Sequence, residues 1–224
     1  MLSKNEIKWV KSLEHKKFRD REGLFVAEGP KVVSELSKSF ECVSMYEDPD
    51  DVARLSFLRH PQDVLAVFRK KEPAPLPLEP QGLMVALDRV QDPGNLGTII
   101  RIADWFGVDT IVCSEDTADV WNPKVVQATM GSLARVSVVY ADLPSVIERY
   151  NGPVYGTFLD GENIYDTELS KEGIVVFGNE GNGISDDVRK LISKRILIPP
   201  TRKGAESLNV AIATAITLAE FRRR

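Results

Sequence analysis

Three segments in the C-terminal two-thirds of the chain place glycine, asparagine and charged residues directly after an apolar, strand-like run. They cover residues 92–104, 175–185 and 196–211. These residue types suit ligand binding at the end of a strand, because glycine lets a ligand approach the backbone closely and a following helix N-terminus attracts negative charge. Each segment is therefore a candidate part of a binding or catalytic site.

The first segment reads DPGNLGTIIRIAD. Its proline and glycine predict a turn, and a helix is expected to open near Asn95. Arg101 then falls in the second helical turn, where its long side chain can fold back past the start of the helix. An ordinary turn with an asparagine cap and a surface arginine is the plainer alternative, so this segment alone does not identify a site.

The second segment reads VVFGNEGNGIS, a strand that runs into a glycine-rich turn and a new helix. Its spacing is not the GxGxxG of a dinucleotide-binding turn, and no Lys-Ser or Lys-Thr follows as in a phosphate-binding loop.

The third segment, ILIPPTRKGAESLNVA, places a basic loop after a strand. Ser207 then stands at an expected helix start with Asn209 in the first turn, and helix capping is the common use of such a serine.

Short β-branched runs alternate with longer helical patterns throughout residues 83–224. This alternation predicts a parallel sheet with helices on both faces, an α/β fold in which ligands lie outside the carboxyl ends of the strands. Strands are expected near residues 84–87, 110–113, 136–139, 154–158, 174–177 and 195–198. Helices are expected at residues 96–106 and 123–133, after Leu143, after Ser185, and at residues 207–221.

A proline-rich stretch at residues 73–82 predicts a semi-rigid linker. It separates residues 1–72 from residues 83–224, and both pieces have plausible domain sizes. The first piece combines helical patterns around Val10 and Val33 with an apolar run at residues 63–68, which indicates a small α/β module.

The 224 residues are 43% hydrophobic and 28% charged, with a net charge of −4, which favours a globular protein over one that coats nucleic acid by bulk charge. A basic stripe from Lys4 to Arg21 is compatible with phosphate contacts, although a solvated helix face is the plainer interpretation.

Cys42 and Cys113 stand apart from any CxxC or histidine cluster, so reduced thiols and no metal site are expected. With no apolar run long enough for a membrane and no secretory signal, a cytoplasmic protein is expected.

Together the three segments resemble the three motifs of the SpoU (TrmH-like) family in the SPOUT superfamily. The matching phrases are Asn-Leu-Gly-x-x-x-Arg, Gly-Asn-Glu-Gly and Ile-Pro…Ser-Leu-Asn-Val, in the family's order. The likeness includes residues 122–132, where the family often has arginine and serine at the positions of Gln127 and Thr129, and so covers the whole C-terminal piece. Motif three departs from the pattern, since residues 201–203 precede a displaced Gly204. The N-terminal piece is similar, less specifically, to the family's small RNA-binding domain.

The resemblance implies an S-adenosylmethionine-dependent methyltransferase that acts on the ribose 2′-hydroxyl of a nucleotide in rRNA or tRNA, without a metal. It also implies a homodimer with a reactive centre completed across the interface, and a C-terminal trefoil knot around the donor pocket, although knots are otherwise nearly absent from proteins. The implied catalytic residues are Asn95, Arg101, Glu180, Ser207 and Asn209. The implied donor-binding residues are Thr157, Leu159, Gly178, Asn179, Gly181, Ile198, Pro199, Ser207 and Leu208. The basic residues expected to contact RNA are Lys16, Lys17 and Arg19.

Within this implied site, Arg101 is expected to hold the substrate phosphate and stabilise the forming alkoxide, because a guanidinium with a pKa above about 12 is a poor base. Two alternatives stay open. An RNA-binding or ribosome-assembly factor could keep the fold without turnover, although the intact implied catalytic residues argue against it. A nucleotide-dependent oxidoreductase would use the same kind of sheet, but the first strand is not followed by GxGxxG.

Overall fold

The computed structural model describes residues 2–202 and 207–223, which form two compact units. The first unit contains residues up to Glu72 together with residues 119–135, and the second contains residues 73–118 and the rest of the chain from Val136. This grouping differs from the continuous range 83–224 expected from the linker, because the segment from Asp119 to Arg135 packs with the first unit.

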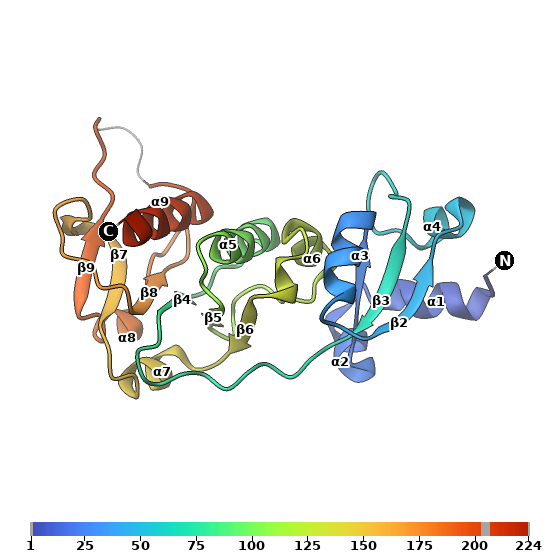
Figure 1. Ribbon diagram of the computed structural model, residues 1–224, viewed down its shortest axis with the longest axis horizontal. Helices are drawn as coiled ribbons and strands as arrows, with labels where there is room; N and C mark the ends of the chain where they lie inside the picture. The colour runs from blue at the N-terminus through green and yellow to red at the C-terminus, as the bar shows by residue number, and fades with distance from the viewer. Residues whose placement is uncertain (1, 203–206, 224) are drawn as a thin grey trace. The chain divides into compact units, whose positions relative to one another are not determined.

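The first unit is a small α/β module around an antiparallel sheet (Figure 1). Within its described residues the sheet has three strands in the order β1-β3-β2. The strands are β1 (Leu24–Glu28), β2 (Cys42–Tyr46) and β3 (Leu65–Arg69). The helices are α1 (Lys4–Ser12), α2 (Lys16–Glu22), α3 (Pro30–Ser37), α4 (Pro49–Leu55) and α6 (Pro123–Ala128), followed by a 3₁₀ turn at Ser132–Ala134. All five residues of β1 are buried although β1 lies at one edge of the described sheet, because helices such as α3 and α6 pack against it.

An aromatic contact and a buried ion pair join residues 119–135 to the rest of the first unit. The ring of Trp121 lies 4.6 Å from that of Phe25, centroid to centroid. Arg19 is 1% exposed, pairs with Asp119 at 2.5 Å and donates hydrogen bonds to the carbonyls of Leu13 and Glu14. The prediction that Arg19 contacts RNA phosphates is therefore wrong, because its guanidinium is enclosed and already engaged.

Replacing Arg19 with leucine is expected to destabilise the first unit by about 3–5 kcal/mol, since it leaves the half-buried Asp119 carboxylate without its partner. Urea unfolding followed by circular dichroism measures the change. Lys16→Leu is the matched control, because the Lys16–Asp20 pair is exposed and such pairs contribute about 1 kcal/mol or less. Equal urea midpoints of unfolding for the two variants would show that the buried Arg19–Asp119 pair does not stabilise the first unit more than the exposed pair does.

The second unit is built on a parallel sheet that has six strands in the described part of the chain, in the order β6-β5-β4-β8-β7-β9. The strands are β4 (Leu83–Leu87), β5 (Thr110–Cys113), β6 (Ser137–Tyr140), β7 (Val154–Asn163), β8 (Gly173–Phe177) and β9 (Lys194–Leu197). Helices α5 (Pro93–Trp105) and α9 (Val210–Arg223) cover one face, and α7 (Leu143–Glu148) and α8 (Asp186–Arg189) cover the other (Figure 1). The predicted α/β fold is confirmed.

Burial along the strands explains why this sheet forms. Every residue of β4 and β8 is buried, as expected for central strands packed on both faces, whereas the edge strand β6 is half-buried throughout. Alternate residues of the central strands, such as Met84 and Val176, pack with α7 and α8. The apolar runs in the sequence therefore fix which strands lie in the middle.

Both helices that carry candidate site residues begin at a different place from the one predicted. Helix α5 starts at Pro93, because the Asp92 carboxylate accepts a hydrogen bond from the backbone N–H of Asn95 at 2.8 Å. Arg101 consequently lies in the third turn rather than the second. Helix α9 starts at Val210, and Asn209, not Ser207, caps it by accepting hydrogen bonds from the amides of residues 211 and 212.

The segment between β9 and α9 includes residues 203–206, among them the displaced Gly204, which lie outside the described residues. The trefoil knot stays a prediction. Both cysteines are free thiols, and burial raises the pKa of the Cys113 thiol. In the described ranges, none of the helices has the length and apolar character needed to cross a membrane.

Candidate active site

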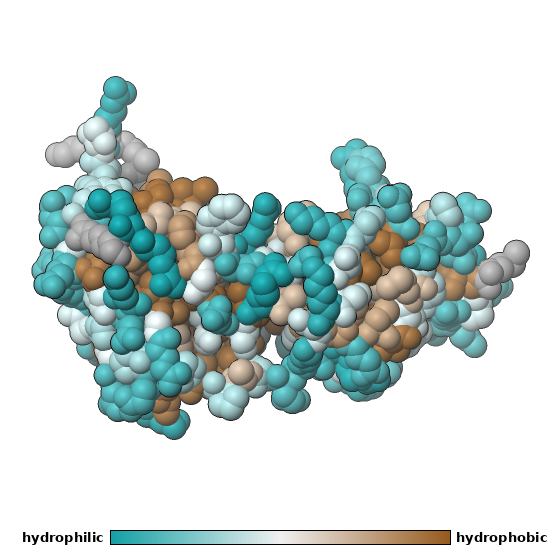
Figure 2. Space-filling view, in the orientation of Figure 1, coloured by the Kyte–Doolittle hydropathy of each residue, from teal (hydrophilic) through white to brown (hydrophobic). Residues whose placement is uncertain are grey.

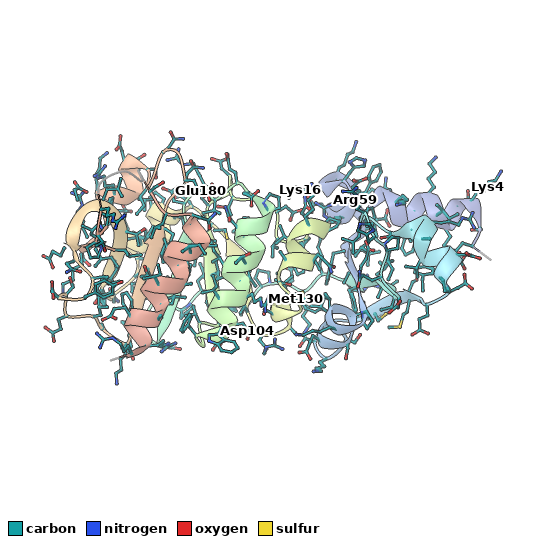
Figure 3. All side chains as sticks on the ribbon, turned by 90° about the horizontal axis from the view of Figure 1, so that it is seen from above. Lys4, Lys16, Arg59, Asp104, Met130 and Glu180 are labelled. Carbon is teal, nitrogen blue, oxygen red and sulfur yellow. The ribbon has the colours of Figure 1, made fainter. Side chains whose placement is uncertain are left out.

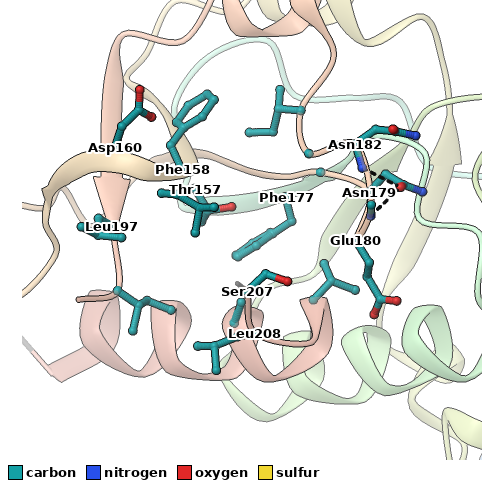
Figure 4. A pocket seen from close by; sticks show the side chains of 18 of the residues that line it. Thr157, Phe158, Asp160, Phe177, Asn179, Glu180, Asn182, Leu197, Ser207 and Leu208 are labelled. Carbon is teal, nitrogen blue, oxygen red and sulfur yellow. Dashed lines mark hydrogen bonds between the residues drawn. The ribbon is translucent and has the colours of Figure 1, made fainter. Parts of the chain in front are cut away.

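A pocket of about 390 Å³ lies at the carboxyl ends of β7, β8 and β9 (Figure 4). Its walls come from residues within β7, from the ends of β8 and β9 and the segments that follow them, and from the start of α9. The lining residues are 157–160, 177–184, Arg189, 197–198, 207–208, Val210 and Ala213. The pocket therefore opens where the parallel sheet was expected to bind a ligand.

All but one of the predicted donor-binding residues line this pocket. They are Thr157, Leu159, Gly178, Asn179, Gly181, Ile198, Ser207 and Leu208. Pro199 is not among the described lining residues. The pocket is also lined by Phe158, Asp160, Phe177 and Arg189, which the sequence does not predict. Phe158 and Asp160 adjoin predicted positions on β7.

The glycine-rich turn after β8 is shaped by its own backbone. A Cβ on Gly178 would lie 2.2 Å from the carbonyl carbon of Gly183, so only glycine fits there. Gly183 has a φ of +67°, a conformation that favours glycine. The Asn179 side chain accepts hydrogen bonds from the amides of residues 181 and 182 and donates one to the carbonyl of Arg89. These glycines thus close the turn on itself, which fixes the position of Glu180 within it.

Side chains from all three motifs meet beside the pocket. The side-chain amide nitrogen of Asn95, Nδ2, donates a hydrogen bond to Glu180 Oε1 at 2.5 Å. The Asn209 amide donates to Asn95 Oδ1 and to Glu180 Oε1, both at 2.9 Å. The helix starts of α5 and α9 are therefore tied to the turn after β8, and residues far apart in sequence form one polar cluster, the Asn95–Glu180–Asn209 cluster.

The other two predicted catalytic residues lie differently. Ser207 is exposed and lines the pocket, where it is free of the capping role that Asn209 takes. Arg101 is exposed on α5, six residues beyond Asn95, which is about 9 Å along the helix axis. It is absent from the described pocket lining. Hydrogen bonds thus join Asn95, Glu180 and Asn209, and Ser207 lines the adjoining pocket, whereas Arg101 lies farther along α5.

Residues 82–219 match the SpoU rRNA Methylase family. The chain belongs to this family. Residues 4–52, which lie in the first unit, also match the MRM3-like substrate binding domain. The three motif segments all fall within the range matched to the methylase family.

Known SpoU-family proteins resemble the chain along nearly its whole length. It is 32% identical over 203 residues to the 23S rRNA (guanosine(2553)-2′-O)-methyltransferase RlmP of Bacillus subtilis, covering 89% of this chain and 79% of the relative. A putative RNA methyltransferase of the TrmH family from Porphyromonas gingivalis has a TM-score of 0.90 and 40% identity, covering 100% of this chain and 99% of that one. An AdoMet-bound rRNA methyltransferase from Sinorhizobium meliloti has a TM-score of 0.89 and 29% identity, covering 100% and 97%.

Proposed function

We propose that the protein is an S-adenosylmethionine-dependent methyltransferase that methylates the ribose 2′-hydroxyl of a nucleotide in RNA, with ribosomal RNA the favoured substrate. The observation that carries this proposal is the Asn95–Glu180–Asn209 cluster, in which all three SpoU motifs meet beside one pocket. The names of the Bacillus and Sinorhizobium proteins support both the reaction and the donor.

The pocket fits the donor by size and chemistry. Its volume of about 390 Å³ is within the usual range for small-ligand sites. The apolar lining residues Phe177, Leu197, Ile198 and Leu208 offer contacts for an adenosyl group. Figure 4 shows polar side chains of the turn after β8, Asn179 and Glu180, on the side of the pocket away from Leu197. When bound, S-adenosylmethionine supplies a sulfonium methyl group that a nucleophile can take.

The chain's own residues have to bring a weak nucleophile, a ribose hydroxyl, in line with that methyl group. The rigid cluster of Asn95, Glu180 and Asn209 fixes one side of the reaction site, and alignment of this kind accounts for much of the acceleration in such transfers. Arg101 would hold the substrate phosphate and stabilise negative charge on the attacking oxygen. The reaction needs no metal in this scheme.

Because Arg101 is not among the described residues that line the pocket of its own chain, we propose that it serves the pocket of a second copy in a homodimer. Helices α5 and α9 run side by side (Figure 3) and carry large exposed apolar side chains, with Trp105 83% and Ile212 51% exposed. Apolar side chains reach the surface over α9 in Figure 2. A two-fold contact through these helices would bury them.

Trp105→Glu is expected to convert the dimer to a monomer and to lower methyl transfer by at least about tenfold, since it places a charge in an apolar interface. Light scattering coupled to size-exclusion chromatography measures the mass. Met45→Glu is the control, because Met45 is also exposed, at 46%, but lies on β2 of the first unit. A monomeric wild type at micromolar concentration would refute the shared site.

Lys16 and Lys17 keep their proposed role in RNA binding, since both are exposed on α2. The double variant Lys16→Glu/Lys17→Glu is expected to weaken RNA binding and to lower the slope of log affinity against log salt by roughly 1–2. Fluorescence anisotropy at several salt concentrations measures this slope. Unchanged affinity and slope would return these lysines to an ordinary solvated helix face.

Calorimetric titration distinguishes the proposed function from the oxidoreductase alternative. We expect the full chain to bind S-adenosylmethionine and not NAD. Binding of NAD without binding of S-adenosylmethionine would contradict the proposal.

A further inference from the structure

A bulge near the end of β7 carries side chains to one side of the pocket. Thr157 and Glu162 of β7 both pair with Ile196 of β9, so residues 158–161 leave the ladder between them. A Cβ on Gly161 would lie 2.6 Å from the backbone of Ile196, which shows how closely the bulge packs. Bulges commonly redirect side chains beside binding sites, and Phe158 and Asp160 of this bulge line the pocket.

Two arginines contact the bulge in different ways. The Cζ atoms of Arg195 and Arg189 lie 4.4 Å and 4.9 Å from the centroid of the Phe158 ring. Arg195 also forms an ion pair with Asp160. Arg189 Nη2 is 3.8 Å from the same carboxylate oxygen, an ion pair that is too long for a hydrogen bond. Arg195 therefore holds Asp160, while the Arg189 guanidinium is stacked in place at the pocket wall with capacity to bind an anion.

The charged residues of the pocket match the charges of the donor. Of the described residues that line it, Arg189 is the only cation, and Asp160 and Glu180 are the two carboxylates. S-adenosylmethionine has one carboxylate and two cationic centres, an ammonium and a sulfonium. Its ammonium and carboxylate share one carbon, and correspondingly Asp160 and Arg189 lie together. Figure 4 shows Glu180 across the pocket from Asp160.

We propose that Arg189 and Asp160 bind the amino acid end of S-adenosylmethionine, Arg189 its carboxylate and Asp160 its ammonium, while Glu180 faces the sulfonium. This assignment rests on the proposed function and deepens it by setting the direction in which the donor lies. The methyl-bearing sulfur is then on the side of Asn95 and Asn209. Arg195 is a positioning residue that acts through Asp160.

Calorimetry on the full-length protein tests the assignment with three ligands that differ in charge. They are S-adenosylmethionine, its decarboxylated form, which keeps both cationic centres, and 5′-methylthioadenosine, which lacks the amino acid end. Arg189→Ala is expected to weaken binding of S-adenosylmethionine about tenfold, the loss of one charge-assisted hydrogen bond at a partly exposed site, and to leave the other two affinities nearly unchanged. Asp160→Asn is expected to weaken both amine-bearing ligands but not 5′-methylthioadenosine.

Lys190→Ala is the matched control, because Lys190 follows Arg189 directly as the C-cap of α8, pairs with Asp187 and is absent from the described pocket lining. It should bind all three ligands as the wild type does. Equal weakening of all three ligands by Arg189→Ala, or no weakening of S-adenosylmethionine, would overturn the assignment alone. A wild-type protein that binds none of the ligands would overturn the proposed function and the assignment with it.

Discussion

Replacing Arg101 with alanine is expected to lower the rate of methyl transfer at least about 100-fold and to leave the affinity for S-adenosylmethionine nearly unchanged. The rate loss is what the removal of one group that stabilises a developing oxyanion causes. Donor affinity should persist because Arg101 is absent from the described pocket lining. Single-turnover transfer of a labelled methyl group measures the rate, and calorimetry measures the affinity.

Two controls sharpen this test. Arg101→Lys keeps the charge but loses the planar fork, so it should recover only part of the rate. Arg149→Ala removes another exposed arginine from the second unit and should change neither quantity. Wild-type activity in Arg101→Ala would remove Arg101 from the mechanism. A large loss of donor affinity would instead place Arg101 in contact with the donor.

Asn209→Asp is expected to lower methyl transfer about 100-fold while changing the stability of the protein by less than about 1 kcal/mol. Asn209 uses its oxygen to cap α9 and its amide group to bind Asn95 and Glu180. Aspartate caps a helix as well as asparagine does, so stability should hold. Aspartate cannot donate a hydrogen bond to Glu180, and its carboxylate repels that of Glu180. The hydrogen bonds that join residue 209 to Asn95 and Glu180 should therefore be lost.

Asn209→Ala completes the comparison, because it removes both the cap and the amide donors. It should be inactive and also less stable by about 1 kcal/mol in thermal unfolding. If Asn209→Asp keeps wild-type activity, the hydrogen bonds of the Asn95–Glu180–Asn209 cluster do not position the reaction site. If both variants lose the same stability, capping by Asn209 is not what starts α9.

The parallel sheet of the second unit could be predicted because its strands are short apolar runs that alternate with helices. The strand order could not be predicted, because it depends on which crossovers the chain makes. Strand β4 was expected at residues 84–87 and spans Leu83–Leu87. The helix starts were harder, since Asp92 and Asn95 are both good caps and only the observed hydrogen bond decides between them. The same difficulty applies to α9, since Ser207 and Asn209 are both good caps and only the observed hydrogen bonds identify Asn209.

What the sequence could not supply are contacts between distant segments. In the sequence Arg19 is one of several basic residues expected at the surface. In the structure it is buried in the first unit and pairs with Asp119, a hundred residues away. The bulge at residues 158–161 has no recognisable sequence pattern, so the sequence does not predict the ion pairs of Asp160 with its arginine partners. The family motifs, by contrast, located Asn95, Glu180 and Asn209, because their types and order carry information that spacing alone does not.

Transfer of tritiated methyl from S-adenosylmethionine to ribosomal RNA, followed by alkaline hydrolysis, tests the central claim most directly. A methylated 2′-oxygen cannot attack the adjacent phosphate, so the label should be recovered in alkali-resistant dinucleotides. The account predicts this product for the wild-type protein and its loss for Arg101→Ala. Label recovered on a base in mononucleotides, or no transfer by a protein that binds the donor, would contradict it.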